Sequence, residues 1–129
     1  MAFALIIPIV NSTGDYVFQR RTDDAPTDAG LLGLFGGSIE TDETPLEAAF
    51  RELKEETSLD VSVEDLQLVI DADMPTLKGP IHAHVFTVSI RETTLEVYEG
   101  TGFEVLSKDA FLKRVDTSKG ARHLLALMG

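Results

Sequence analysis

The chain contains no cysteine among its 129 residues. It can therefore form neither a disulfide framework nor a zinc–thiolate site, and it cannot use a thiol nucleophile. It also lacks a long hydrophobic run, because its longest apolar stretch, residues 2–10, has about half the length of a membrane span. That stretch has neither the basic flank nor the small-residue cleavage site of a secretory signal. From these absences we expect a cytoplasmic protein with no membrane partner.

Basic residues are scarce. The chain has 11 Lys and Arg against 22 Asp and Glu, which gives a net charge of −11. Such a surface repels a polyphosphate backbone at long range, so we expect no nucleic-acid polymer as a partner. A small anionic substrate is not excluded, because a bound divalent metal can invert the local electric field.

The length and the absence of repeats or long linkers indicate a single domain over residues 1–129. Hydrophobic residues make up 43% of the chain and charged residues 26%, as in an ordinary globular protein. Strands surrounding one central helix, with further helices at the end, predict an α/β or α+β fold. We expect strands at 2–10, 16–20, 66–73 and 81–90, shorter strands at 95–98 and 103–107, and C-terminal helices at 108–114 and from 117 onward.

The clearest local signal is a helix that begins at Pro45. Thr44 precedes it as an N-cap, and Glu47 completes a capping box. We expect the helix to end near residues 57–58. An apolar stripe for packing follows the start at i, i+3, i+4 and i+7, formed by Leu46, Ala49, Phe50 and Leu53.

Three carboxylates, those of Glu52, Glu55 and Glu56, share one face of this helix. Like charges at such spacings oppose one another by roughly 0.2–0.5 kcal/mol per pair, and by more when they are partly buried. A bound cation would remove this cost, and clustered carboxylate oxygens suit Mg²⁺ or Mn²⁺. Taken alone, however, a run of charges is more often a solvated face, with Arg51 and Lys54 as incidental partners.

The surrounding sequence favours the metal. Residues 37–59, GSIETDETPLEAAFRELKEETSL, resemble the Nudix box, which continues from its glycine through a glutamate to Arg-Glu-apolar-x-Glu-Glu-x-Gly-apolar. Ser58 stands where that family usually has glycine, and Phe35 where a proline often precedes the double glycine. Glycine there supplies a left-handed backbone, so we expect Ser58 to lower stability by about 1 kcal/mol without affecting the chemistry. The matching positions are Gly37, Glu43, Arg51, Glu52, Leu53, Glu55, Glu56 and Leu59.

The order of the flanking segments is also similar to that of small MutT-type Nudix hydrolases. The resemblance implies the Nudix fold, an α/β/α sandwich with a mixed sheet, in which the box forms a loop–helix–loop motif. It further implies a catalytic Mg²⁺ (or Mn²⁺) bound mainly by Glu52 and Glu56. Glu55 and the carbonyl oxygen of Gly37 would assist in binding the metal.

The same resemblance implies that Arg51 orients the acidic residues and that Glu43 pairs with Arg51. Members of the family often recruit one more carboxylate from a distant loop, as a metal ligand or a general base. Glu99 stands where some of them place it, and Glu96 lies close by in the sequence.

Hydrolysis of a diphosphate linkage needs a water aimed at phosphorus and neutralisation of charge on the phosphate oxygens. A Mg²⁺ ion bound to the helix could do both. A carboxylate then takes the proton from the water, and Glu52, Glu55 and Glu99 are all candidates that the sequence does not rank.

The resemblance implies a Mg²⁺-dependent pyrophosphohydrolase, and a (d)NTP or oxidised dNTP, cleaved to the monophosphate and pyrophosphate, is the favoured substrate. ADP-ribose or a nucleotide sugar is an alternative substrate. A Nudix-fold nucleotide sensor without turnover is a further alternative, although the helix glutamates are intact. A prenyl-diphosphate isomerase of this fold normally uses a cysteine, which this chain lacks. Many relatives are dimers, so a homodimer is also implied.

Two residues outside the helix are candidates for substrate binding. Arg20 and Arg21 end the second expected strand. Family analogy implies that Arg21 contacts a phosphate, and the alternative is that both arginines form plain surface pairs. Phe35, beside the double glycine, could flank a nucleobase, although the phenylalanines of such a chain more often belong to the core.

Histidine is also present in a spaced pair. His82 and His84 alternate on one strand face and could bind a metal, but no third ligand is evident nearby in the sequence. A role in the core or in lining a pocket is therefore favoured. Asp71 and Asp73 share a strand face in the same way, and we expect them to face solvent.

Overall fold

The chain folds into a mixed β-sheet with helices on both faces, and the computed structural model describes residues 1–76, 78–91 and 95–128. In chain order the elements are β1 (Ala2–Val10), β2 (Tyr16–Arg20), β3 (Leu32–Gly33), β4 (Phe35–Ser38), α1 (Pro45–Glu56), the 3₁₀ helix η1 (Val63–Asp65), β5 (Gln67–Met74), β6 (Ile81–Ile90), β7 (Gly102–Leu106), α2 (Lys108–Lys113) and α3 (Lys119–Ala126). The seven-stranded sheet has the order β3-β2-β1-β6-β5, with β4 also paired to β1 and β7 to β2.

The centre of the sheet is formed by β1 and β6, which run parallel to each other. The remaining strand pairs are antiparallel. The hydrophobic run of β1 is buried on both faces, as expected for a strand covered from both sides. Ala4 and Ile6 belong to the core beneath α1, whereas Leu5 and Ile7 belong to the core beneath α2 and α3.

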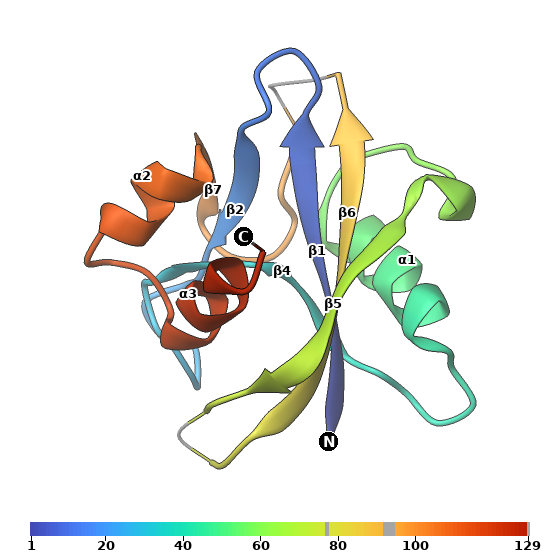
Figure 1. Cartoon of the computed structure of the whole chain (residues 1–129), viewed down its shortest axis with the longest axis horizontal. Coiled ribbons are helices and arrows are strands. Elements are labelled where there is room, and N and C mark those ends of the chain that lie inside the picture. The colour runs from blue at the N-terminus through green and yellow to red at the C-terminus, as the bar shows by residue number, and fades with distance from the viewer. Residues whose placement is uncertain (77, 92–94, 129) are drawn as a thin grey trace.

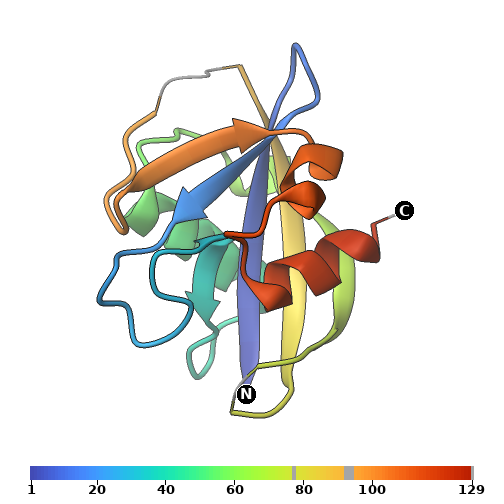
Figure 2. The same cartoon turned by 90° about the vertical axis from the view of Figure 1, so that its left-hand side faces the viewer.

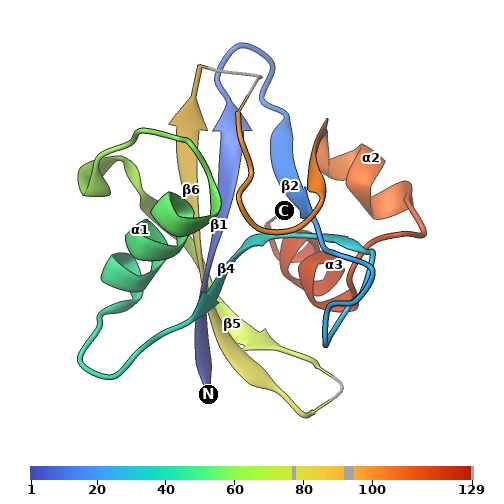
Figure 3. The same cartoon turned by 180° about the vertical axis from the view of Figure 1, so that it is seen from behind.

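Two hydrophobic cores hold the layers together. Helix α1 covers one face of the sheet, and α2 and α3 cover the other (Figures 1 and 3); Figure 2 shows the layers from the side. In the second core the rings of Phe18 and Phe111 stack with centroids 4.1 Å apart. The expected α/β/α sandwich with a mixed sheet is thus confirmed. Among the described residues, no helix is both long and apolar enough to cross a membrane.

The expected strand at 95–98 is wrong. Only Val97 forms a bridge there, with Thr57, while Leu95 is buried in the core beneath α1. The segment instead gives its backbone hydrogen bonds to the end of α1, because the N–H of Tyr98 donates to the carbonyl oxygen of Glu56 at 2.7 Å. Residues 95–98 are therefore not a strand of the sheet. They form a segment, called the brace below, that pairs with the C-terminal end of α1 and holds it in place.

The expectation for Ser58 is also wrong. Among the described residues, positive φ at a non-glycine position occurs at Asp28 and Asp42, not at Ser58. Helix α1 ends in extended backbone at Thr57, and Ser58 then pairs with Glu96. The N–H of Ser58 donates to the Glu96 carbonyl oxygen at 2.9 Å, and the N–H of Glu96 donates to the Ser58 hydroxyl at 2.8 Å. Serine therefore carries no left-handed strain here.

Candidate active site

Helix α1 is fixed at its beginning by the capping box. The hydroxyl of Thr44 accepts the N–H of Glu47 at 3.1 Å, and the Glu47 carboxylate accepts the N–H of Thr44 at 2.8 Å. These bonds satisfy two backbone groups that would otherwise be unpaired at the helix start. With the brace at the other end, they set the positions of the glutamates along the helix.

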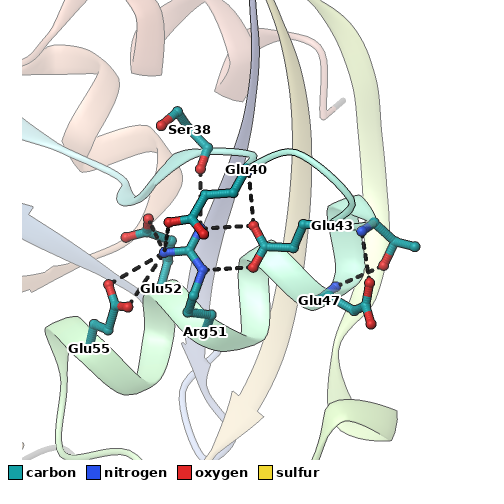
Figure 4. Close-up of polar contacts among 8 residues, drawn as sticks. Ser38, Glu40, Glu43, Glu47, Arg51, Glu52 and Glu55 are labelled. Atoms are coloured by element: carbon teal, nitrogen blue, oxygen red, sulfur yellow. Dashed lines mark hydrogen bonds and ion pairs between the residues drawn. The ribbon is translucent and has the colours of Figure 1, made fainter.

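Arg51 is the centre of an ion-pair network on this helix (Figure 4). Its guanidinium donates to both oxygens of Glu43, at 2.7 and 2.9 Å, in the bidentate geometry that strengthens such pairs. It also donates to Glu52 Oε1 at 2.9 Å and to the Ser38 carbonyl oxygen at 3.2 Å, and lies 3.4 Å from Glu55. Hydrogen bonds from Arg51 lower the pKa of Glu43 to about 2. The network therefore holds Glu43 ionised and gives Glu52 a fixed orientation.

Glu56 is in a different environment, since it is only 1% exposed. Its carboxylate accepts hydrogen bonds from the Gln19 amide at 3.1 Å and from the N–H of Gly36 at 3.1 Å. Burial raises the pKa of Glu56, and the neighbouring carboxylates of Glu52 and Glu99 raise it further. None of its hydrogen-bond partners within the described residues carries a positive charge. An ionised Glu56 would therefore be stabilised by a bound cation.

Two glycines of β4 approach these carboxylates closely. Gly36 has φ +134°, and a Cβ there would lie 2.2 Å from the Ala4 carbonyl oxygen, so no larger residue fits. A Cβ at Gly37 would lie 2.6 Å from Glu52 Oε1. The missing side chains leave room for the backbone of β4 beside Glu56 and for the carboxylate of Glu52.

A cavity of about 240 Å³ opens beside Glu56. Arg21 lies at this cavity and is held by a hydrogen bond from its Nε to the Thr27 carbonyl oxygen at 2.8 Å. None of the lining residues, all in the described part of the chain, is aromatic, and most are polar or charged. The lining is formed by Gln19, Arg21, Thr22, Asp24, Ala25, Pro26, Gly36, Glu56, Glu99 and Gly100.

The two neighbouring arginines point to different places. Arg20 forms ion pairs with Glu104 and with Asp116, the latter at 3.0 Å. Arg114 joins the same carboxylates, so this network connects β2 and β7 with the segment around α2. Arg21, in contrast, lines the cavity.

The structure also separates the two candidate loop carboxylates. Glu99 lies at the cavity and close enough to Glu56 to raise its pKa, whereas the backbone of Glu96 pairs with Ser58 at the end of α1. Glu55 lies at the rim of the Arg51 network with about half of its side chain exposed. Phe35 is fully buried in the core beneath α1. Its ring has no exposed face on which a base could stack, so Phe35 is left out of the substrate site.

Gln19 is a site residue that the sequence analysis missed. It is 5% exposed, and its amide donates both to Glu56 and to the backbone carbonyl oxygen of Glu99, at 3.1 and 3.0 Å. It therefore connects α1 with the loop before β7. The available signal was its position: Gln19 is in phase with the buried Val17 of the same strand, where a polar side chain needs a partner.

The donor set fits a divalent cation such as Mg²⁺. That ion binds one or two protein carboxylates and completes its shell with waters and substrate phosphates, so it needs no closed cage of side chains. Glu52, Glu56 and Glu99 supply carboxylate oxygens from α1 and from the loop before β7. Their mutual repulsion, seen in the raised pKa of Glu56, is the cost that such an ion would remove.

Comparison with known proteins identifies the family. The family model of the NUDIX domain matches residues 2–105. Among solved structures, the chain is similar to a MutT protein from Methanosarcina mazei, with TM-score 0.85, 19% identity, and coverage of 99% of this chain and 91% of that one. It is also similar to the Escherichia coli dihydroneopterin triphosphate pyrophosphohydrolase (TM-score 0.78, 22% identity, coverage 98% and 92%).

A third similar structure is the NUDIX domain of Shewanella oneidensis NrtR in complex with ADP ribose, with TM-score 0.73, 14% identity and coverage of 97% and 82%. At such low identities these likenesses establish the fold. The family model spans most of the chain and includes the whole glutamate helix. The chain therefore belongs to the Nudix family of hydrolases, which act on phosphoric anhydrides.

Proposed function

We propose that the protein is a Mg²⁺-dependent pyrophosphohydrolase that converts a (d)NTP or an oxidised dNTP to the monophosphate and pyrophosphate. The observation that carries this proposal is the buried Glu56, whose pKa is raised by the neighbouring Glu52 and Glu99 and which lines a polar cavity together with Glu99 and Arg21. A charged cavity of this kind suits the polyphosphate part of a nucleotide better than its base.

The metal would be held by Glu52 and Glu56, with Glu55, Glu99 and the Gly37 carbonyl oxygen as the additional ligands. When bound, Mg²⁺ (or Mn²⁺) would polarise the phosphoryl oxygens and lower the pKa of the attacking water. The raised pKa of Glu56 supports this assignment, because a group that resists ionisation alone is well placed to ionise against a cation.

The other residues act by position and charge. Arg51, held by Glu43, orients Glu52, and Gln19 orients Glu56. Arg21, which lines the same cavity, would contact a phosphate of the substrate.

The reaction balances with one water. The water oxygen forms a bond to phosphorus, the anhydride P–O bond breaks, and the bridging oxygen leaves with the departing phosphate group. The proton of the water passes to a carboxylate, for which Glu52, Glu55 and Glu99 remain the candidates. Glu99 is supported by its place on the cavity wall.

ADP-ribose or a nucleotide sugar is the second candidate substrate. It is favoured by the likeness to a NUDIX domain that was crystallised with ADP ribose. The products distinguish the two, because hydrolysis of a triphosphate releases pyrophosphate whereas ADP-ribose yields AMP and a sugar phosphate.

The deciding experiment measures product release from NTPs, oxidised dNTPs, ADP-ribose and nucleotide sugars, with Mg²⁺ and with EDTA. Turnover in Mg²⁺ should fall by roughly 10²–10⁴-fold in Glu56→Gln, because a metal ligand is lost. Glu96→Gln is the matched control, since this exposed carboxylate lies outside the cavity. Metal-dependent binding of a nucleotide without any turnover would refute the hydrolase and identify a nucleotide sensor.

A further inference from the structure

A second group of metal-ligating side chains lies on the β5–β6 hairpin. Antiparallel pairing places Asp71 opposite His84 and Asp73 opposite His82, so all four side chains project from the same face of the sheet. The sequence analysis found no third ligand for the two histidines because the third ligand comes from the neighbouring strand. The aspartates are exposed to solvent as expected, and both also contact His82.

The geometry of this cluster resembles a metal site. The ligand atoms of Asp71, His82 and His84 all lie within 4.8 Å of one another, and this is the one such group of His, Asp and Glu that the described residues contain. Asp71 Oδ1 contacts His82 Nε2 and lies 3.9 Å from His84 Nδ1. The two imidazole rings meet edge to face with centroids 4.9 Å apart.

We propose that Asp71, His82 and His84 bind a transition-metal ion of the Zn²⁺ class. Two imidazole nitrogens and one carboxylate oxygen form a donor set that such ions prefer and that Mg²⁺ does not. Three protein ligands leave a fourth position for water or for another ligand. An ion between Asp71 and His82 would replace their direct contact, so the two side chains would have to move apart.

Asp73 has a separate role in this site. While Nε2 of His82 faces Asp71, its Nδ1 lies 2.8 Å from Asp73 Oδ1. A carboxylate that accepts the second ring N–H of a histidine fixes the tautomer and the orientation that a metal needs. Asp73 is therefore a positioning residue for His82.

The site is distinct from the glutamate helix. His84 pairs with Ala4 across β6 and β1, and Ala4 pairs with Gly37 across β1 and β4, which places two strand spacings, roughly 10 Å, between the backbones of His84 and Gly37. In Figure 1 the far end of the hairpin points away from α1. His82 and Asp71 are 40% and 55% exposed, so an ion can enter from solvent. The proposal does not depend on the enzymatic activity.

The test is a calorimetric titration of the full chain, without an affinity tag, with Zn²⁺ in the presence of excess Mg²⁺ to occupy the glutamates. One equivalent of Zn²⁺ should bind, and binding should be lost in His82→Ala/His84→Ala and in Asp71→Asn. Asp73→Asn should weaken binding by roughly 10-fold, because it keeps the ligands but loses the contact that orients His82. His123→Ala, which removes the remaining histidine, on the exposed side of α3, should leave binding unchanged.

Three results would overturn the proposal: no Zn²⁺ binding by the wild-type chain, unchanged binding in Asp71→Asn, or loss of binding in Glu52→Gln/Glu56→Gln. The last result would mean that zinc occupies the glutamate helix instead. Asp71→Asn and Asp73→Asn change one atom each at exposed positions, so they keep the test decisive even where the double histidine variant fails to fold. Shifts of the His82 and His84 ring protons on zinc addition, with His123 unmoved, would locate the ion.

Discussion

The molecule contains two groups of carboxylates whose negative charge is balanced in different ways. On the β5–β6 hairpin, Asp71 has an imidazole as its partner, and that contact lowers the pKa of Asp71. On α1, Glu56 is buried beside Glu52 and Glu99, and its pKa is raised. The contacts of the hairpin group favour a positive charge on His82, whereas the hydrogen-bond partners of Glu56 within the described residues are neutral.

The contrast exists even within α1. Glu52 lies on the side of the helix where Arg51, itself held by Glu43 of the preceding loop, supplies a fork of donors. Glu56 lies where the donors are the neutral Gln19 and Gly36. A site built to bind a divalent cation needs carboxylates that are held in place but not neutralised. Arg51 holds Glu52 in place on one side, and on the other side the hydrogen-bond partners of Glu56 in the described part of the chain leave its charge to be balanced by a metal.

Of the changes around Arg51 and Glu52, Arg51→Met should have the largest effect. This change leaves Glu43 and Glu52 without their guanidinium, and we expect kcat to fall about 100-fold as Glu52 loses its orientation. Stability should fall by about 1–2 kcal/mol, less than for a fully buried pair, because both carboxylates keep some exposure. Steady-state kinetics and urea unfolding measure the two quantities. Arg51→Lys should recover only part of kcat, since an ammonium lacks the fork.

Arg91→Met is the control for that variant, because Arg91 is an exposed arginine just after β6. It should change neither kcat nor stability. An unchanged kcat in Arg51→Met would show that the orientation of the Glu52 carboxylate does not depend on the Arg51 guanidinium.

A smaller loss of activity should follow from Gly37→Ala. The new Cβ would lie 2.6 Å from Glu52 Oε1, so the carboxylate must move although the backbone needs no unusual φ. We expect kcat to drop roughly 10-fold with little change in thermal stability. Gly33→Ala is the matched control, because its nearest contact, the Ser118 hydroxyl, is an ordinary 3.4 Å away. Equal kcat values for the two variants would show that the position of the Glu52 carboxylate does not affect the reaction.

The sequence could predict one side of this comparison better than the other. Helix α1 is specified locally: its cap, its first proline and its apolar stripe all lie within residues 44–53, and the structure confirms them. The Asp/His cluster was not predictable, because its members lie on two strands whose register is set by pairing over the whole hairpin. A residue's burial is likewise set by distant segments, which is why the sequence left both a core role and a nucleobase contact open for Phe35, and the structure decides for the core.

The same reason explains the misreading of residues 95–98. Their alternation satisfies the pattern of a strand, yet the available partner is the end of α1 rather than a sheet edge. Gln19 was missed because its meaning depends on Glu56 and Glu99, which lie 37 and 80 residues away in the chain. Local signals predict elements, and long-range pairing decides which side chains meet.

The effect of Glu56 on stability can be measured in the absence of metal. Because the pKa of folded Glu56 is above its unfolded value near 4.5, the stability that its protonated form contributes is present at low pH and is lost as the pH rises through the folded value. Glu56→Gln removes this titration, so in EDTA the variant should become more stable than the wild type as the pH rises from 4.5, by about 1–2 kcal/mol above neutral pH. Urea unfolding across pH measures the difference. Mg²⁺ should stabilise the wild type but not the variant. A variant that is less stable than the wild type at every pH would show that ionised Glu56 does not destabilise the folded state.

The smallest effect on stability is expected for the His82 contacts on the β5–β6 hairpin. Contacts with Asp73 and Asp71 raise the pKa of His82, so in EDTA their stabilisation is complete below the unfolded histidine value near 6.5 and is lost as the pH rises through the folded one. At the acidic limit it is lost again as Asp71 protonates. His82→Gln should therefore lower Tm slightly between these limits and not at alkaline pH, and the change should be small because His82 and Asp71 are 40% and 55% exposed. Because a proton and a metal compete for the same imidazole, Zn²⁺ should stabilise the hairpin most at the alkaline end, where the ion pair has gone. A Tm difference that persists unchanged at alkaline pH in EDTA would mean that His82 stabilises the hairpin by packing rather than by charge.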